Sequence, residues 1–179
     1  MDDTPPSVKK TKLQWRTLTP ALLPHLSHIA ATIHPGLAER DAVFLERITL
    51  FPTGCLGLFD DEESNTLYGY LISHPIRHQE PPELDSLLGE IAKDADQYYI
   101  HDLAILPEAR GSGLAQRGVE KVLGTAAQAY KTSCLASVYG TTAFWGKFGF
   151  EKPEVVSARL GEKLLGYGDE AVYLERKNG

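Results

Sequence analysis

The residues best suited to chemistry lie in one segment, residues 98–115, with the sequence YYIHDLAILPEARGSGLA. An apolar strand ends there at a proline, a turn with Arg110 and two glycines follows, and a helix begins. Gly111 and Gly113 let the backbone approach a ligand closely and adopt conformations that side chains disfavour. The first amide N–H groups of a helix lack partners and carry the positive end of its dipole. Such a turn can bind a pyrophosphate through main-chain donors, and Arg110 adds positive charge.

Two other nucleotide-binding patterns are absent from the sequence. No Gly-Lys-Ser/Thr occurs, which argues against a Walker loop, and the glycine spacing differs from GxGxxG, which argues against a dinucleotide-binding Rossmann site. On its own, RGSGLA is equally typical of a plain strand-to-helix turn. The surrounding elements therefore have to decide what the turn binds.

A histidine in the same strand offers acid–base chemistry. His101 is the natural general base, because the unperturbed pKa of imidazole, about 6.5, lies close to neutrality. The alternative is a structural histidine satisfied by backbone or solvent. Asp102 should point to the opposite face of the strand, where it either binds a cationic amine or braces the sheet. The other histidines are expected at the surface or in loops, two of them (His74 and His78) near the acceptor entrance: His25, His28, His34, His74 and His78.

The length of 179 residues fits one domain, residues 1–179, in which residues 1–11 are expected to form a flexible tail. Cys55 and Cys134 lack CxxC spacing and have no cluster of ligands around them. We therefore expect two reduced, buried thiols and no metal site.

Charge and hydropathy restrict the partners. The formal net charge is -6, and the only group of basic residues is Lys9, Lys10 and Lys12, which argues against binding to nucleic acid. No apolar stretch approaches the roughly 20 residues of a membrane helix, and the N-terminus lacks an apolar signal core. These features predict a cytoplasmic protein without a membrane partner.

The elements around the segment can be predicted from periodicity and turn residues. Thr19-Pro20 is typical of a helix start, and apolar residues then recur at helical spacing. Two short apolar runs on either side of the polar tip DDEESN indicate a hairpin. In the first half of the chain we expect a strand at 12–18, helices from 19 and over 37–50, and strands at 55–59 and 67–73.

The second half is less regular at its beginning and at its end. Residues 74–96 show little pattern apart from a short helix predicted at 85–91. We then expect a strand at 98–106, a helix at 113–130, a strand at 134–138, a short helix at 141–147, and a C-terminal hairpin from Phe150 and residues 172–174. This order predicts a mixed α/β fold with a largely antiparallel sheet.

With these elements in place, the sequence resembles the GNAT superfamily of N-acetyltransferases. The family's phosphate-loop pattern, Gln/Arg-x-x-Gly-x-Gly/Ala, stands here as Arg110, Gly113 and Ala115. A second family pattern, an aromatic pair and then Gly-Phe, stands as FWGKFGF at 144–150. The element order matches over roughly residues 12–176. Within the superfamily, the layout of HDLAIL, ARGSGLA and FWGKFGF is most similar to the arylalkylamine (serotonin-type) N-acetyltransferases and related microbial proteins.

The resemblance implies a cofactor and residues that bind it. The fold would be a central sheet splayed at the cofactor strand and flanked by helices, with acetyl-CoA as co-substrate. Main-chain groups for the pantetheine arm would come from Leu103, Ala104 and Ile105. The pyrophosphate would lie on the turn formed by Arg110, Gly111, Ser112, Gly113, Leu114, Ala115 and Gln116. Trp145 would face the thioester end of the cofactor.

The resemblance also implies catalytic roles. The arylalkylamine branch has two histidines on its catalytic strand; the second aligns with His101, the expected base, and the first with Tyr99, expected with Asp102 to contact the substrate. Many members have a tyrosine that protonates the leaving thiolate where this chain has Trp145, whose indole N–H is no useful acid. Tyr139, at the end of the preceding strand, is the nearest expected proton donor.

The predicted function is therefore acetyl transfer from acetyl-CoA to a small primary amine (aryl-, alkyl- or polyamine) by direct attack on the thioester, in a monomer or homodimer. One alternative is an enzyme that acetylates peptides or proteins, because the segments that shape the acceptor site are too irregular to interpret. Another is a non-catalytic acyl-CoA-binding module, which is suggested by Trp145 and by Val138 in place of a family asparagine.

Overall fold

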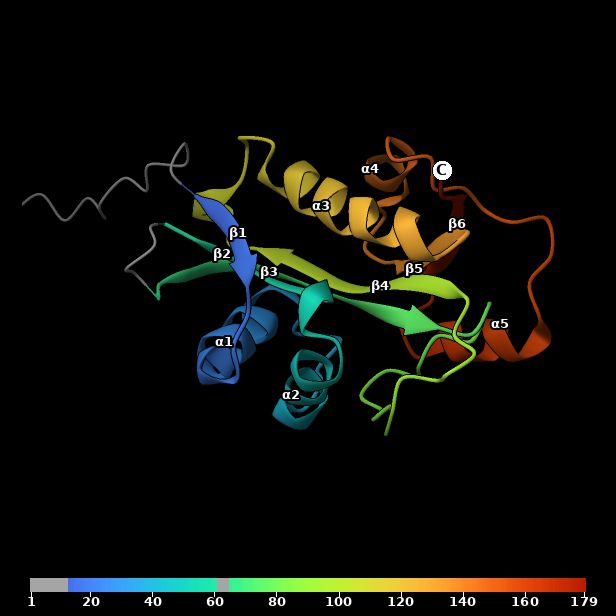
Figure 1. Ribbon diagram of the computed structural model, residues 1–179, viewed down its shortest axis with the longest axis horizontal. Coiled ribbons are helices and arrows are strands. Elements are labelled where there is room, and N and C mark those ends of the chain that lie inside the picture. The colour runs from blue at the N-terminus through green and yellow to red at the C-terminus, as the bar shows by residue number, and fades with distance from the viewer. Residues whose placement is uncertain (1–12, 61–64) are drawn as a thin grey trace, which may run out of the picture.

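A six-stranded sheet runs through the computed structural model, which describes residues 13–60 and 65–179 apart from the side chain of Ala127. The strands lie in chain order, and all neighbours are antiparallel except β4 and β5 (Figure 1). Their bounds are β1 Gln14–Thr17, β2 Cys55–Phe59, β3 Leu67–Ile76, β4 Gln97–Ile105, β5 Thr132–Ser137 and β6 Val172–Lys177. The predicted mixed α/β fold with a largely antiparallel, splayed sheet is confirmed.

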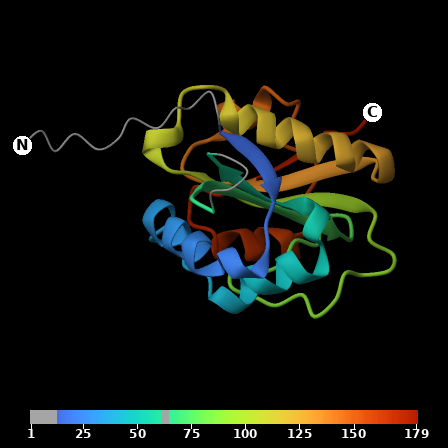
Figure 2. The ribbon, with the colours of Figure 1, turned by 60° about the vertical axis from the view of Figure 1, so that its left-hand side comes forward.

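Helices cover both faces of this sheet (Figures 1 and 2). One face carries α1 (Leu23–Ile33), α2 (Asp41–Leu50) and α5 (Ala158–Leu165), and the other carries α3 (Leu114–Ala129) and α4 (Thr142–Gly146). Short 3-10 turns at Pro20–Leu22, Pro52–Gly54 and Pro107–Ala109 each begin with a proline, whose fixed φ suits the first position of a helical turn. None of the helices in the described part of the chain has the length and apolar character to span a bilayer.

The strands alternate between two cores, as the period of two requires. Leu71 and Tyr98 pack with the α3 side, whereas Tyr70 and Ile72 pack with α1 and α2. The α3 core is closed by Trp15 of β1, whose indole N–H donates to the Leu114 carbonyl over 2.8 Å. A third, smaller cluster joins α5 to the ends of β3 to β6. The site lies where these cores meet.

β4 and β5 separate halfway along β4. They pair only from Gln97 to Ile100, opposite residues 132–135. Beyond Ile100, β4 continues beside β3, whereas β5 continues beside β6 alone. The sheet is therefore open on one side of β4 from His101 onward, and main-chain groups there are available to a ligand.

A β-bulge coincides with this opening. Ile72 lies opposite Asp102 and Ser73 opposite Ile100, so His101 is the extra residue of β4. A bulge breaks the alternation of side chains, and His101 and Asp102 consequently line the same two cavities. The expectation that Asp102 points away from His101 is wrong, because it assumed an unbroken strand.

Several element boundaries differ from the predictions. The first helix begins with a 3-10 turn, and α2 begins at Asp41 rather than at 37, since residues 35–40 form a turn and an extended connection. No helix forms at 85–91, where main-chain groups bind side chains of α2 instead. Cys55 and Cys134 are free and buried, as expected. The strand start at residue 12 and the hairpin tip at 61–64 lie outside the described residues.

The C-terminal region differs most. The expected hairpin is a single strand, β6, and near Phe150 only one isolated bridge forms, between Glu151 and Glu175. The helix α5 was missed. Ser157 caps it by accepting a hydrogen bond from the Leu160 N–H over 3.1 Å, which is a recognisable start signal in the sequence.

The packing of α3 on β1 gives a test of the fold. A Cβ at Gly118 would lie 2.7 Å from Cε2 of Trp15, whereas a Cβ at Gly124 on the same helix meets nothing within 4 Å. Gly124→Ala should stabilise by up to about 1 kcal/mol through helix propensity. Gly118→Ala should be less stable than Gly124→Ala by about 1–3 kcal/mol, because Trp15 must move. Urea unfolding of both variants measures the difference, and equal stabilities would contradict the packing.

Candidate active site

A groove of about 580 Å³ follows the open side of β4 toward the start of α3. It contains nine of the eleven residues expected to bind the cofactor: Leu103, Ala104, Ile105, Arg110, Gly111, Gly113, Leu114, Ala115 and Gln116. Of the other two, Ser112 does not line the groove, and Trp145 lines the chamber next to it. The groove therefore brings together the strand and the turn that the sequence singled out.

The turn is shaped to receive an anion. Gly111 and Gly113 have φ of 91° and 69°, in the left-handed region where glycine is favoured. Gly113 is the N-cap of α3, a Cβ there would meet nothing within 4 Å, and no acidic residue lies in the first turn of the helix. Arg110 donates from Nε to the Ile105 carbonyl over 2.9 Å, which ties the turn to the end of β4. These features fit a pyrophosphate on the helix N-terminus.

A chamber of about 140 Å³ adjoins the inner end of the groove. Leu103, Tyr139, Thr141 and Phe144 line both cavities. The wall of this chamber includes Trp145, which is only 7% exposed and is held edge-on by Phe144 and Phe150. Trp145 thus lines the chamber at the inner end of the groove, and its contact with the thioester stays a prediction.

A third cavity, about 40 Å³, lies on the far side of His101. It shares His101, Asp102 and Val138 with the chamber of about 140 Å³, which we call the thioester chamber. The three cavities therefore follow one another without interruption. Its apolar lining comes from Leu37, Leu84, Ala136, Val138 and Tyr167, and its polar lining from His34, Glu39, His101 and Asp102. We call it the acceptor chamber.

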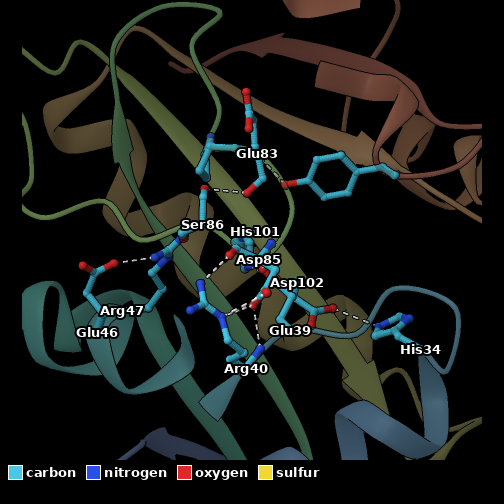
Figure 3. Close-up of polar contacts among 12 residues, drawn as sticks. His34, Glu39, Arg40, Glu46, Arg47, Glu83, Asp85, Ser86, His101 and Asp102 are labelled. Carbon is cyan, nitrogen blue, oxygen red and sulfur yellow. Dashed lines mark hydrogen bonds and ion pairs between the residues drawn. The ribbon is translucent and has the colours of Figure 1, made fainter. Parts of the chain in front are cut away.

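His101 is held by a buried carboxylate. Its side chain is fully buried, and its Nε2 lies 2.7 Å from Oε1 of Glu39 (Figure 3). The other oxygen of Glu39 accepts from the backbone N–H of Asp85 over 3.1 Å. Because a carboxylate can only accept here, Nε2 of His101 carries a hydrogen. Its Nδ1 has no hydrogen-bond partner among the described residues.

Asp102 joins two further side chains. Its Oδ2 accepts from the Tyr70 hydroxyl over 2.6 Å. Its Oδ1 lies 2.9 Å from Nε2 of His34 (Figure 3). The His34 contact is an ion pair whose angle is outside hydrogen-bond geometry. The ring of His34 also stacks on Tyr139, with centroids 5.6 Å apart and planes 6° from parallel.

The charges of this pair follow from their contact. Burial alone would lower the pKa of His34, but the contact with Asp102 and its charge outweigh burial and raise that pKa. Burial alone would raise the pKa of Asp102, yet His34, the charge of His101 and the Tyr70 hydrogen bond together lower it. The preferred state is a carboxylate beside an imidazolium.

His74 lies behind His101 in β3. It is fully buried, and its ring centroid lies 6.1 Å from that of His101. Burial, followed by repulsion from His101, lowers the pKa of His74 to about 3, so this imidazole is neutral. The expectation that His74 is a surface or loop residue is wrong, because His74 is buried in the core. His34 is a loop residue as expected, directly after α1, but its side chain is only 12% exposed and lines the groove.

Tyr99 and Tyr139 occupy different environments. Tyr99, expected to contact the substrate, is 1% exposed and packs in the cluster under α5; it lines none of the three cavities. An alignment on the strand alone does not reveal that α5 covers this position. Tyr139 is 54% exposed, has a φ of 55° and lines the groove and the thioester chamber. Burial and the charge of Asp102 raise the pKa of its phenol.

Two residues of the site were not found from the sequence, His34 and Glu39. A signal for His34 existed, because it follows buried Leu26 and half-buried Ala30 at steps of four residues and so continues the inner face of α1. Glu39 lies in an irregular connection and carried no such signal. Its 6% side-chain exposure and its pairing with His101 come from tertiary structure alone.

Comparison with known proteins supplies the family. Residues 23–150 match the sequence model of the acetyltransferase (GNAT) family. The chain belongs to this family. As a member of the GNAT family, the protein is an acetyltransferase with acetyl-CoA as acyl donor, and the turn and groove described above fit that molecule. No curated protein sequence matches the chain significantly.

Solved structures share the fold at low sequence identity. Ard1 from Thermoplasma volcanium is 14% identical with a TM-score of 0.68, and the alignment covers 93% of this chain and 97% of that one. Arabidopsis thaliana Naa50, in complex with the bisubstrate analogue CoA-Ac-MVNAL, is 13% identical with a TM-score of 0.66 and coverage of 92% and 98%. The GNAT-like decarboxylase GphF, in complex with isobutyryl-CoA, is 18% identical with a TM-score of 0.67 and coverage of 93% and 100%. At these identities the likeness shows the GNAT fold and does not define the acceptor.

The turn can be tested with a pair of glycine variants. Gly113→Val places a side chain in the open space before the helix amides and should weaken acetyl-CoA binding roughly tenfold or more, a loss of about 1.4 kcal/mol or more. Gly149→Val imposes the same kind of backbone strain, at a φ of 81°, outside the groove. Calorimetric titration with acetyl-CoA should show weak binding for Gly113→Val alone. Equal losses in both variants would mean that strain, and not the groove, is responsible.

Proposed function

We propose that this acetyltransferase acts on a small primary amine with an apolar body, such as an arylalkylamine. The observation that carries the proposal is the acceptor chamber, in which Glu39 and Asp102 lie beside two imidazoles while the remaining walls are apolar. A protonated amine is attracted by the carboxylates, and its hydrocarbon part fits walls formed by Leu37, Leu84 and Val138. The arylalkylamine branch, which the sequence resembles, has the same substrate chemistry.

The roof of the chamber supports a small acceptor over a peptide. It is the segment of residues 81–90, of which Leu84 lines the chamber. This segment is bound to α2 and to the residues before it: Arg40 pairs with Asp85 over 3.0 Å, and Arg47 donates to the Ser86 carbonyl over 3.0 Å (Figure 3). Both oxygens of Glu46 accept from backbone N–H groups of the same segment. A roof held in this way limits the size of an acceptor.

The other edge of the roof is bound to the α5 region. Lys163 donates to the Pro81 carbonyl and Tyr167 to the Pro82 carbonyl, each over 2.9 Å. The segment is thus held on two sides by elements that are distant in sequence. A peptide would have to displace more of these hydrogen bonds than a small amine would.

The chemistry follows from the order of the cavities. The bound ammonium first loses a proton to solvent. The neutral amine nitrogen then attacks the thioester carbon at the boundary between the acceptor and thioester chambers, and a second proton passes from it to Nδ1 of His101. The Glu39 carboxylate stabilises the imidazolium that forms, as a carboxylate does for a histidine base in other acyl-transfer sites. The thiolate then requires a proton. The sequence predicts Tyr139 as the donor of this proton.

The role of His101 has a signature in pH. His101→Ala should lose roughly 100- to 10,000-fold in kcat/KM near neutral pH and recover partly at high pH, where free amine is abundant. Glu39→Gln should lower kcat/KM less, with the same dependence on pH, because the imidazole remains but the charge that orients it is gone. Rates from thiol release between pH 6 and 10, about the span from imidazole to amine titration, provide the profile. An equal loss of kcat/KM at all pH values would mean that His101 has a structural role only.

The acceptor class is tested with a panel of amines. We expect release of CoA thiol, and an acetylated product by mass spectrometry, with 2-phenylethylamine or tryptamine and acetyl-CoA. A short peptide with a free N-terminus should give little release. Release with the peptide alone would favour a peptide acetyltransferase, and acetyl-CoA binding without release would favour a non-catalytic module.

A further inference from the structure

His34 lies where the three cavities of the site meet. Among the residues that the structure describes, it alone lines the acetyl-CoA groove, the thioester chamber and the acceptor chamber. His101, by contrast, lines the two chambers but not the groove. The sulfur of the donor has to lie where the groove opens into the thioester chamber. The imidazole of His34 is therefore on the sulfur side of the reaction, and that of His101 is on the amine side.

His34 is held by three contacts, one through its backbone and two through its ring. Its backbone N–H ends α1 by donating to the Ala30 carbonyl over 2.8 Å. Nε2 lies 2.9 Å from Asp102, and Tyr139 covers one ring face. The side chain is 12% exposed, and Nδ1 has no hydrogen-bond partner within residues 13–60 and 65–179. One ring nitrogen is thus committed to a carboxylate, while the other is buried without a hydrogen-bond partner among the described residues, beside the Leu103 main chain that borders the groove. A buried nitrogen without a partner is a candidate for contact with a ligand.

Asp102 favours the protonated form of this imidazole. Tyr70, fully buried in the core, donates to the second oxygen of Asp102 over 2.6 Å and so keeps the carboxylate in place and ionised. Despite burial, the contact and charge of Asp102 raise the pKa of His34. Burial and the same charge raise the pKa of the Tyr139 phenol, which makes it a weaker acid than a free phenol. The imidazolium is therefore the better proton donor of the two.

We infer that His34 is the general acid of the reaction, donating the proton on Nδ1 to the CoA sulfur, with Asp102 as its positioning residue. Tyr139 covers the ring and limits its contact with water. The inference rests on the acetyl transfer proposed above but not on which amine is the acceptor. It divides proton transfer between two buried pairs, His101 with Glu39 and His34 with Asp102.

The step balances without a further reactant. The bond between the amine nitrogen and the acyl carbon forms, and the bond between that carbon and sulfur breaks with its electron pair on sulfur. The bound ammonium first releases one proton to solvent, because only the neutral amine can attack. The attacking nitrogen then loses one proton to His101, and His34 gives one proton to the thiolate. The products are the amide and the free thiol. His101 ends protonated and His34 neutral. Both are restored when His101 releases a proton to solvent and His34 takes one up.

The charge state of His34 depends on groups from several elements. Asp102 and the Leu103 main chain on β4 and the charge of Glu39 before α2 raise its pKa. Tyr139 after β5 stacks on the ring, Tyr70 on β3 acts through its bond to Asp102, and His101 lines the same two chambers. Because the acid must be protonated, kcat should fall as pH rises through the pKa of His34. Asp102→Asn removes the charge that raises this pKa, so the falling limb should move to lower pH.

Kinetics of matched histidine variants test the assignment. With 2-phenylethylamine and saturating acetyl-CoA, His34→Gln should lower kcat roughly 100-fold and remove the falling limb, while the KM for acetyl-CoA changes little. His28→Gln makes the same substitution on an exposed turn of α1 and should behave like the parent. Tyr139→Phe should lose less than His34→Gln and keep the limb, because its ring still covers the imidazole.

A second measurement needs no acceptor. An imidazolium beside the sulfur should lower the pKa of the bound CoA thiol, by about one pH unit or more relative to His34→Gln. The ultraviolet absorbance of the thiolate in the CoA complex gives this pKa for the parent, His34→Gln and Tyr139→Phe. If the parent acetylates no amine, the proposed acceptor class fails, yet this titration still decides the position of His34.

The outcomes separate the two candidate acids. A raised thiol pKa and a lost falling limb in His34→Gln alone support His34. A large kcat loss and a raised thiol pKa in Tyr139→Phe, with parent-like values in His34→Gln, would overturn the inference in favour of Tyr139. Parent-like thiol pKa values in both variants would also overturn it, since no protein acid would then face the sulfur.

Discussion

β4 leaves β5 after Ile100 and shifts its register with β3 at the next residue, and this double irregularity shapes the whole site. The separation frees main-chain groups of β4 and opens the groove that receives the donor. The bulge turns His101 and Asp102 to one side, so two ionisable side chains adjacent in sequence can serve one cavity. An unbroken strand would have buried one of them on the opposite face of the sheet. Bulges are frequent next to active sites for this reason.

Burying so many ionisable groups costs stability unless each has a partner. Glu39 and Asp102 provide those partners for His101 and His34, and both carboxylates are bound a second time, by the Asp85 N–H and the Tyr70 hydroxyl. These second bonds matter because a buried carboxylate held at two points keeps its orientation when the charge beside it changes. The proton transfers proposed above would need that property.

Contacts between distant elements place these groups. His34 ends α1, Glu39 precedes α2, and the roof over 81–90 is held by α2 and by the α5 region. These long-range contacts explain why segments without regular secondary structure hold defined positions. Segments without internal regularity satisfy their polar groups through long-range side chains. The acceptor end of the protein is therefore determined by packing, whereas the donor end depends on a local turn.

How much the sequence determines differs between these two ends. The strand at 98–106, the glycines of the turn and the long helix after them follow from local rules of backbone conformation and periodicity, and nine of the eleven expected cofactor residues line the groove. The order of elements was sufficient for the fold class. Local sequence patterns do not predict the bulge, the packing of α5 over Tyr99, or the contact between Glu39 and His101. These depend on which surfaces meet once the chain is compact, and a carboxylate in an irregular connection gains a role only from the imidazole that tertiary structure brings within 2.7 Å of it.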